Sequence, residues 1–199
     1  MILKQTKLID RIIKKFGQEN AHTARVPLSN NLDNCGDLDT KFPYRSLVGS
    51  LMYLSTGTRP DISYAVKELS RFLENPRSSV VTAAKQVVRY IKGTTDQGIV
   101  YEAKEGHPWC DVHGWSDSDF AGEKIGRSST TGYVIQICGC TISWKSSSQT
   151  IVAQSTAEAE YIALWTLGRE VSFIFELITD SFRVDFKDKL PSELPIRND

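Results

Sequence analysis

The stretch Gly132-Tyr-Val-Ile-Gln-Ile-Cys-Gly-Cys-Thr-Ile-Ser-Trp-Lys145 decides how the second half of the chain folds. Residues 132–137 are rich in β-forming side chains, Gly139 marks a turn, and residues 141–145 resemble a returning strand in composition. The stretch therefore predicts a β-hairpin. Residues 112–119, just before it, open with mixed apolar and polar side chains and predict a further strand.

A long helix is predicted after the hairpin. Ser155-Thr156-Ala157-Glu158 is a capping box, in which the first and last side chains satisfy free amides at a helix start. Polar residues 179–193 predict a linker, and residues 194–199 predict the start of another strand. The apolar residues at helical spacing form the expected buried face: Ala159, Ile162, Ala163, Leu167, Val171, Ile174, Leu177 and Ile178.

The first half of the chain is predicted to be helical. One helix covers residues 8–16 and stops at Gly17, a typical C-terminal cap, and the polar residues 18–42 predict a loop. Three more helices are expected: after Pro43, from Thr58 to Asn75-Pro76, and over 79–92. Their inward residues are Leu47, Leu51, Met52, Leu54, Ile62, Ala65, Val66, Leu69, Phe72, Leu73, Ala84, Val87, Val88 and Ile91.

These patterns predict an α/β (α+β) protein, with a helical N-terminal segment followed by a sheet covered by one helix. The charges divide in the same way, although Lys+Arg and Asp+Glu both number 24. Residues 1–97 hold 15 Lys/Arg and 9 Asp/Glu, a net charge of +6, and residues 98–199 hold 9 and 15, a net charge of −6. Two domains, 1–97 and 98–199, are therefore predicted. Such a dipole is typical of a nucleic-acid clamp beside a metal-binding carboxylate site, but it also arises without function.

The composition excludes several classes of protein. Of the 199 residues, 40% are hydrophobic and 10% aromatic, which excludes a disordered chain. No run of 18 apolar residues exists, so no membrane partner is expected. Charged residues interrupt the apolar N-terminus, so no secretory signal is present there. We expect an intracellular protein, with secretion as the alternative if a leader precedes Met1.

The four cysteines, Cys35, Cys110, Cys138 and Cys140, are too sparse for a disulfide-stabilised secreted scaffold. Cys110 with His113, and Cys138 with Cys140, offer possible zinc ligands, but their spacing does not match the usual paired motifs. Reduced thiols are therefore expected.

Three carboxylates are candidates for a metal site. Asp117 ends a predicted strand, Glu160 lies in the second turn of the predicted helix, and Asp199 ends the last strand-like segment. If these strands are adjacent and the helix packs across them, the carboxylates converge and offer the oxygen ligands that Mg²⁺ or Mn²⁺ prefers. Two such ions, about 4 Å apart, promote phosphodiester cleavage. Acidic residues are also common at strand ends and in first helical turns, so the spacing leaves both interpretations open.

A row of cations lies on the outer face of the helix predicted over 79–92. Lys85, Arg89 and Lys92 follow each other by about one turn. Three cations so placed can follow a phosphate backbone. A solvated helix face explains the same spacing.

Eight blocks of sequence fall into two groups. The first group is Tyr44-Arg-Ser-Leu-Val-Gly-Ser-Leu-Met-Tyr-Leu54, Thr58-Arg-Pro-Asp-Ile-Ser-Tyr-Ala-Val66, Leu69-Ser-Arg-Phe72 and Ala83-Ala-Lys-Gln-Val-Val-Arg-Tyr-Ile-Lys-Gly-Thr94. The second is Gly114-Trp-Ser-Asp-Ser-Asp-Phe-Ala-Gly122, Arg127-Ser-Ser-Thr-Thr-Gly-Tyr133, Ile142-Ser-Trp-Lys-Ser146 and Ser155-Thr-Ala-Glu-Ala-Glu-Tyr161. In this order and spacing they resemble the C-terminal part of a copia-type retrotransposon Pol polyprotein, over nearly all of the chain.

The resemblance implies a fold and a chemistry. The first group is similar to the thumb or connection of a reverse transcriptase, and the second to a ribonuclease H domain. That domain is a mixed five-stranded sheet with helices, which cleaves the RNA of an RNA–DNA hybrid with two Mg²⁺ held by four acidic residues. Asp117, Glu160 and Asp199 are similar to the first three of these. Asp119 and Glu158 are near neighbours that are easily confused with them. The expected nucleic-acid contacts are Lys85, Arg89, Lys92 and Lys145.

The chain also departs from that family. It stops at the third carboxylate, so the following helix, last strand and fourth ligand are expected to be missing, as is the upstream polymerase palm. Val80-Val81 replaces a His-Trp pair that the family tends to have. Asp199 is expected to fray at the C-terminus. Because loss of a ligand weakens metal binding, we expect little or no nuclease activity from this chain alone.

Two alternatives to an inactive remnant stay open. One is a working ribonuclease H that takes its missing pieces from a partner. The other follows from a similarity to secreted RxLR effectors of plant pathogens, virulence proteins that would act in host cells by binding a host-cell protein. The nearest matches to Arg-x-Leu-Arg are incomplete: Arg45-Ser-Leu-Val48 and Arg71-Phe-Leu-Glu74.

Overall fold

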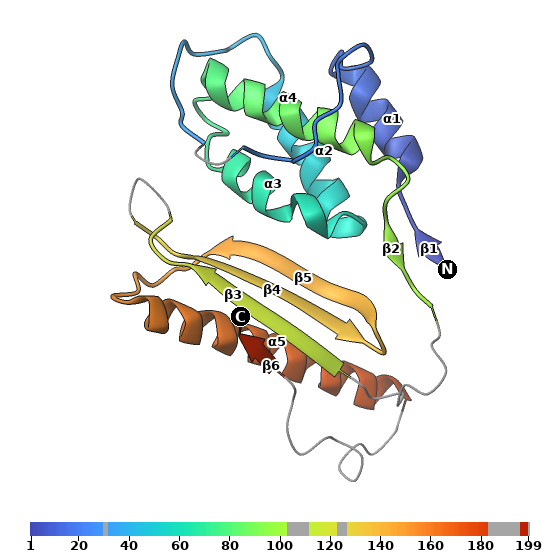
Figure 1. Cartoon of the computed structure of the whole chain (residues 1–199), viewed down its shortest axis with the longest axis vertical. Coiled ribbons are helices and arrows are strands. Elements are labelled where there is room, and N and C mark those ends of the chain that lie inside the picture. The colour runs from blue at the N-terminus through green and yellow to red at the C-terminus, as the bar shows by residue number, and fades with distance from the viewer. Residues whose placement is uncertain (30–31, 103–111, 123–126, 183–195, 199) are drawn as a thin grey trace. The chain divides into compact units, whose positions relative to one another are not determined.

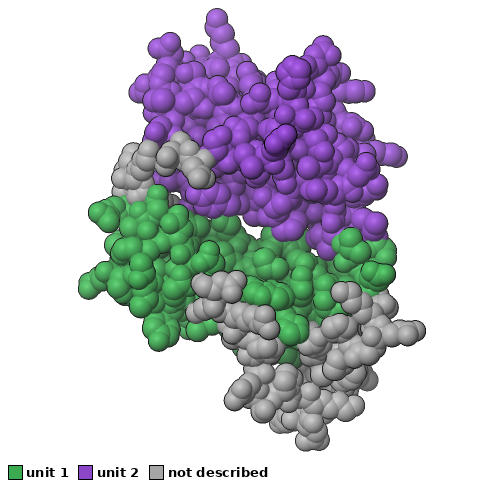
Figure 2. All heavy atoms as spheres, viewed as in Figure 1, with its two compact units in different colours: residues 1, 100–199 green, residues 2–99 purple. Residues whose placement is uncertain are grey.

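The computed structural model describes residues 1–29, 32–102, 112–122, 127–182 and 196–198. The chain divides into two compact units, residues 2–99 and residue 1 with residues 100–199 (Figure 2). Two short strands, β1 (Ile2–Leu3) and β2 (Ile99–Val100), pair as a separate small sheet. Among the described residues, no helix combines the length and apolar character needed to cross a membrane.

Residues 2–99 form a helical unit around one apolar core (Figure 1). Its elements are α1 (Thr6–Lys15), α2 (Tyr44–Gly57), a short 3-10 helix (Pro60–Ile62), α3 (Ser63–Ser70) and α4 (Ser78–Gly93). Each predicted helix is present. Gly17, with a φ of 64°, follows α1 in the left-handed conformation that the predicted cap requires.

Two details of the helical prediction are wrong. Helix α3 ends at Ser70 and does not continue to Asn75-Pro76, because the amides of Arg71 and Phe72 bond to carbonyls three residues back in tight turns. Met52, which was expected to face the core, is 43% exposed.

The Thr58-Arg-Pro-Asp61 block builds a polar cluster around the buried Arg59; this Arg59 cluster consists of Arg59, Asp61, Tyr90 and Thr94. Arg59 is 1% exposed, and its Nη2 donates to Asp61 Oδ2 at 2.8 Å and to Thr94 Oγ1 at 2.6 Å. The Tyr90 hydroxyl donates to the same Asp61 oxygen at 2.8 Å. Burial favours the neutral acid, but the hydrogen bonds and charge of Arg59 outweigh it and lower the pKa of Asp61. The cluster thus joins the start of the 3-10 helix to the end of α4.

The second unit is a four-stranded mixed sheet with one long helix. Its elements are β3 (Val112–Asp119), β4 (Thr130–Ile137), β5 (Cys140–Ser148), α5 (Thr156–Phe182) and β6 (Ile196–Asn198). The strand order is β5-β4-β3-β6, with β3 parallel to β6 and the other pairs antiparallel. Mixed α/β architecture is confirmed, as is the adjacency of the strands that lead to Asp117 and to residue 199.

The predicted hairpin is present, with Cys138 and Gly139 as its two-residue loop. Both residues have positive φ, 50° and 76°, which is the backbone twist that favours a two-residue connection between twisted strands. Among the described residues, Cys35, Cys138 and Cys140 form no disulfide, and Cys110 lies outside the described residues. No group of three metal-ligating side chains occurs in the described part of the chain.

Helix α5 lies along one face of the sheet (Figure 1). Helix α5 can approach the sheet closely at Gly114 of β3, because this residue has no side chain. A Cβ atom there would lie 3.1 Å from the Leu167 side chain of α5. Two expectations need correction: Leu177 is 54% exposed, and the helix extends through residues 179–182, which were expected to be linker. The remaining predicted inward residues are buried or half-buried, namely Ala159, Ile162, Ala163, Leu167, Val171, Ile174 and Ile178.

Candidate functional site

Glu160 is positioned at the end of the central strand β3. The capping box fixes the start of α5, since the Glu158 amide donates to Ser155 Oγ at 3.1 Å. Two residues further on, Glu160 Oε1 accepts a hydrogen bond from Ser118 Oγ of β3 at 2.7 Å. Its other oxygen, Oε2, is buried and has no hydrogen-bond partner among the described residues. A buried carboxylate oxygen without a donor is costly, so this atom suits a cation or an added donor.

Asp117 lies one residue from Ser118, on the other face of the sheet. The pairing of β3 with β4 runs from Val112 to Asp119 without a register shift, so successive side chains alternate between faces. Gly114 and Ser118 meet α5, which assigns Asp117 to the opposite face, where its side chain is exposed. The structure therefore does not bring Asp117 and Glu160 onto one face, contrary to expectation.

The third predicted carboxylate, Asp199, lies outside the described residues. Strand β6 runs parallel to β3 up to the pair of Asn198 with Ser116. Asp119 and Glu158, the near neighbours of Asp117 and Glu160, do not lie at this position either: Asp119 is exposed beside the Gly122 backbone, and Glu158 Oε2 accepts the Gln154 amide at 2.7 Å in the helix cap. Of the predicted ligands, the described part of the chain presents only Glu160 with a buried, unpaired oxygen.

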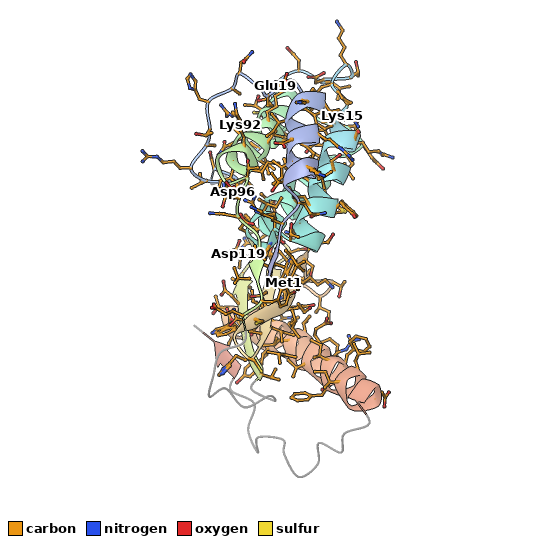
Figure 3. All side chains as sticks on the ribbon, turned by 90° about the vertical axis from the view of Figure 1, so that its right-hand side faces the viewer. Met1, Lys15, Glu19, Lys92, Asp96 and Asp119 are labelled. Carbon is orange, nitrogen blue, oxygen red and sulfur yellow. The ribbon has the colours of Figure 1, made fainter. Side chains whose placement is uncertain are left out.

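The predicted cation row on α4 is not a uniform solvated face. Lys92 Nζ bonds to the main-chain carbonyls of Gln18, Glu19 and Ala21, the last at 2.9 Å, and so fastens the loop after α1 (Figure 3). Lys85 Nζ lies 4.7 Å from the centre of the Phe42 ring. Arg89 is half-buried, and its Nε is buried without a hydrogen-bond partner in the described part of the chain. These contacts give at least two of the three cations a structural role.

Lys145, the fourth predicted nucleic-acid contact, is exposed on β5 and lines a cavity of this unit. This cavity, the α5 groove, has a volume of about 840 Å³ between β5, the loop over 149–155 and the first turns of α5. Tyr161 and Trp165 form its outer wall and are 72% and 62% exposed.

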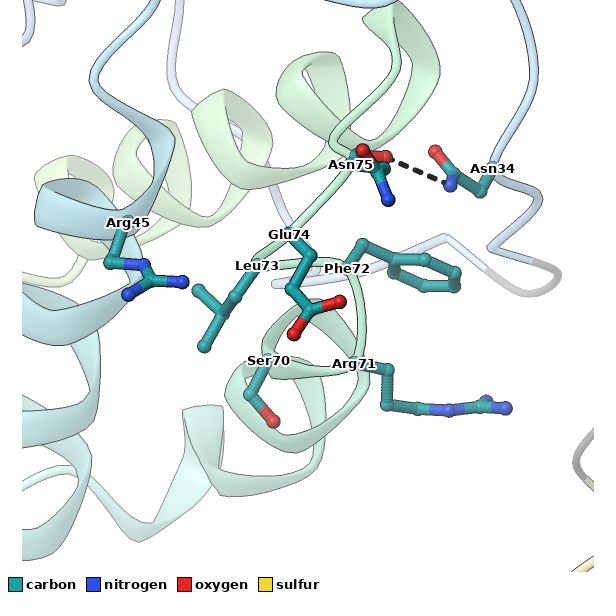
Figure 4. A pocket seen from close by; sticks show the side chains of 8 residues that line it. All are labelled: Asn34, Arg45, Ser70, Arg71, Phe72, Leu73, Glu74 and Asn75. Atoms are coloured by element: carbon teal, nitrogen blue, oxygen red, sulfur yellow. Dashed lines mark hydrogen bonds between the residues drawn. The ribbon is translucent and has the colours of Figure 1, made fainter.

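A smaller cavity of about 440 Å³ lies in the helical unit, between α2 and the segment that follows α3 (Figure 4). Arg45 and Arg71, the first residues of the two incomplete Arg-x-Leu-Arg matches, both line it. Their guanidinium groups do not converge, because Arg71 extends away from Arg45 (Figure 4) and bonds to Glu68 at 3.1 Å. The cavity therefore offers no paired-arginine anion site.

Three residues of these sites were not predicted from the sequence. Ser118 belongs to the Gly114–Gly122 block without a predicted role, and strand alternation is what makes it the neighbour of Glu160. Tyr161 and Trp165 lie four residues apart, outside the apolar face of their helix. Two large aromatic residues one helical turn apart, both outside the predicted buried face, are the sequence feature that could have predicted this exposed pair of rings.

Comparison with known proteins identifies relatives that match most of the chain. It is 39% identical over 183 residues to the retrovirus-related Pol polyprotein from transposon TNT 1-94 of Nicotiana tabacum, covering 86% of this chain. It is 42% identical over 137 residues to that from transposon RE1 of Arabidopsis thaliana, covering 69% of this chain. The chain belongs to the copia-type retrotransposon Pol family. It spans 13% and 9% of the length of these two polyproteins.

Another relative of this copia-type chain is named as a secreted effector and not as a Pol polyprotein. Secreted RxLR effector protein 161 of Plasmopara viticola is 41% identical over 132 residues, which cover 66% of this chain and 91% of the relative. No family model and no solved structure matches the chain. The family assignment therefore rests on similarity between most of this chain and a small part of each Pol polyprotein.

Proposed function

We propose that the second unit is a retrotransposon-derived, ribonuclease H-like module that binds nucleic acid and does not cleave it in the described arrangement. The observation that carries this proposal is the position of Glu160, held against the central strand by Ser118 with one oxygen unpaired. The strand order β5-β4-β3-β6 and the covering helix are consistent with the ribonuclease H resemblance.

The donor set argues against two-metal chemistry in this arrangement. Mg²⁺ or Mn²⁺ prefers several oxygen ligands that converge on one point. Glu160 Oε2 suits one such position, but Asp117 is directed to the other face of the sheet. The described residues therefore offer a single ligand position and do not fit a paired-ion site.

A hybrid assay with Mg²⁺ tests this proposal. We expect the chain to bind a labelled RNA–DNA hybrid, and Lys145→Ala to weaken binding more than Lys14→Ala, an exposed lysine of the helical unit. We also expect cleavage no faster than that of the Glu160→Gln variant. Mg²⁺-dependent cleavage that is lost in Asp117→Asn would refute the non-cleaving proposal, and absence of hybrid binding would refute the binding one.

A second candidate is an effector that acts by binding a host-cell protein. It is favoured by the relative named as a secreted effector, 91% of which this chain covers. Sequencing the transcript upstream of Met1 separates the two candidates. An in-frame polymerase segment supports the Pol-derived module, whereas a secretory leader supports the effector and a location outside the producing cell.

A further inference from the structure

The α5 groove is lined by exposed aromatic rings and a lysine that are not part of the Glu160 site. Its floor comes from β5 and the loop over 149–155, and its outer wall from the first three turns of α5. Tyr161 and Trp165 are largely exposed, although large aromatic side chains are usually among the most buried. Ile151, at the other rim, is 61% exposed. An apolar groove of this size with two exposed rings indicates a ligand with flat apolar faces.

The two rings are spaced for consecutive bases of a single strand. Tyr161 and Trp165 are four residues apart on α5, which corresponds to about 6 Å along the helix axis. Stacked bases in a duplex lie about 3.4 Å apart, so this spacing suits bases splayed by an extended strand. Base stacking on Tyr and Trp needs only a flat face and tolerates any sequence.

Cations stand beside both the floor and the wall of the groove. Lys145 lines the floor, and the guanidinium of Arg169 lies 4.8 Å from the centre of the Trp165 ring. The one acidic residue among those that line the cavity, Glu158, is bound to the Gln154 amide in the helix cap. Cations next to exposed aromatic rings complement a nucleic acid, whose backbone is negatively charged and whose bases can stack on the rings. They do not complement an apolar peptide that has no acidic residues.

A buried amide in the groove lining has an unused acceptor. Gln149 is 7% exposed, and its Nε2 donates to Thr131 Oγ1 at 3.0 Å and to the Ala159 carbonyl at 2.9 Å. Its Oε1 has no hydrogen-bond partner within the described ranges. Exocyclic amines of bases and the 2′-hydroxyl of ribose are donors of the kind this oxygen lacks.

We infer that the α5 groove binds a single-stranded segment of RNA or DNA, with bases stacked on Tyr161 and Trp165 and phosphates beside Lys145 and Arg169. The inference rests on the proposed nucleic-acid role of this unit. The groove would be a second contact surface besides the Glu160 site. It begins at Tyr161, the residue after Glu160, whose side chain is exposed.

The test measures binding of a fluorescent 12-nucleotide oligouridine to the full chain by anisotropy. Trp165→Ala is expected to weaken binding about tenfold, because one base–aromatic stack is lost. Trp165→Phe keeps a ring and is expected to restore most of the affinity. Phe173→Ala removes an aromatic ring that is 58% exposed on the same helix but does not line the groove, and is expected to bind as the wild type does.

Three outcomes would overturn the inference: no binding of oligouridine by the wild type, equal affinity of wild type and Trp165→Ala, or an equal loss in Phe173→Ala. Self-association that Trp165→Ala abolishes would instead assign the groove to a second copy of the chain. A parallel titration with an RNA–DNA hybrid separates this inference from the proposed function. Hybrid binding without a Trp165 effect on oligouridine refutes the groove alone, whereas binding of neither probe refutes both.

Discussion

Removal of the Asp61 carboxylate is expected to destabilise the helical unit strongly. Asp61 accepts hydrogen bonds from Arg59 Nε and Nη2 and from the Tyr90 hydroxyl. In Asp61→Ala the Arg59 guanidinium stays in its buried position, 1% exposed, with Thr94 as its remaining hydrogen-bond partner in the cluster. An uncompensated buried charge is the main source of the loss.

The expected magnitude follows from the burial of the two partners. Breaking a fully buried ion pair costs about 3–5 kcal/mol. The Asp61 side chain is 32% exposed, so solvent already screens part of the attraction and water can replace the lost carboxylate. We therefore expect the free energy of unfolding to fall by about 2–3 kcal/mol.

Urea unfolding followed by circular dichroism at 222 nm measures this loss. With a urea dependence of about 1.5 kcal/mol per molar, the midpoint should fall by about 1.3–2 M. Tryptophan emission serves as an internal control, because all four tryptophans follow residue 99 and so report on the other unit. Asp96→Ala is the matched variant, since its ion pair with Lys4 is 91% and 45% exposed and contributes less than about 1 kcal/mol. A midpoint for Asp61→Ala no lower than that of Asp96→Ala would refute the reasoning.

Three further outcomes are expected. The pKa of Asp61 is lowered in the folded chain, so its contribution to stability is complete above the unfolded pKa of about 3.9 and is lost as the pH falls through the lower folded value; acid titration of Asp61→Asn should lack this loss, and an identical titration curve would contradict it. Tyr44→Phe removes the hydroxyl that donates to the Leu69 carbonyl at 2.8 Å and should cost about 0.5–1.5 kcal/mol by urea unfolding, with no change indicating that the bond does not form. Gly114→Val should lower the thermal midpoint followed by tryptophan emission, because a side chain there meets Leu167; Gly132→Val, where nothing lies within 4 Å of a Cβ atom, is the control, and equal losses would argue against close packing of α5 on β3.

The local patterns predict the elements of the second unit well, because they depend on neighbouring residues. The Ser155 capping box marks the start of α5, and Gly139 marks the hairpin turn. The predicted end of α5 is too early, because the polar residues 179–181 and Phe182 remain helical at the end of a long helix. Propensity alone does not determine where such a helix stops.

The candidate site was only partly predictable. Sequence spacing placed Asp117 at a strand end and Glu160 in the second turn of a helix, and both positions are confirmed. Which face a strand residue points to depends on the register of the whole strand, and a shift of one residue reverses it. That register puts Ser118, and not Asp117, against Glu160.

The cations and the Arg59 cluster show a different limit. Lys85 and Lys92 have the spacing of a phosphate-binding row, but both contact other parts of the chain. Lys85 lies over the Phe42 ring, and Lys92 bonds to carbonyls of the loop after α1. Arg59 and Thr94 belong to two separate blocks of the copia-type resemblance, and a hydrogen bond joins them in one cluster. Contacts between residues this far apart in sequence are not encoded in local periodicity.

The most direct test of the central claim is to count the divalent ions that the chain holds. Electron paramagnetic resonance of Mn²⁺ titrated into the protein measures free and bound ion. Because Glu160 and Asp117 are directed to opposite faces of the sheet, we predict fewer than two bound ions per chain and no effect of Asp117→Asn on their number. Two tightly bound ions, lost both in Asp117→Asn and in Glu160→Gln, would contradict the account.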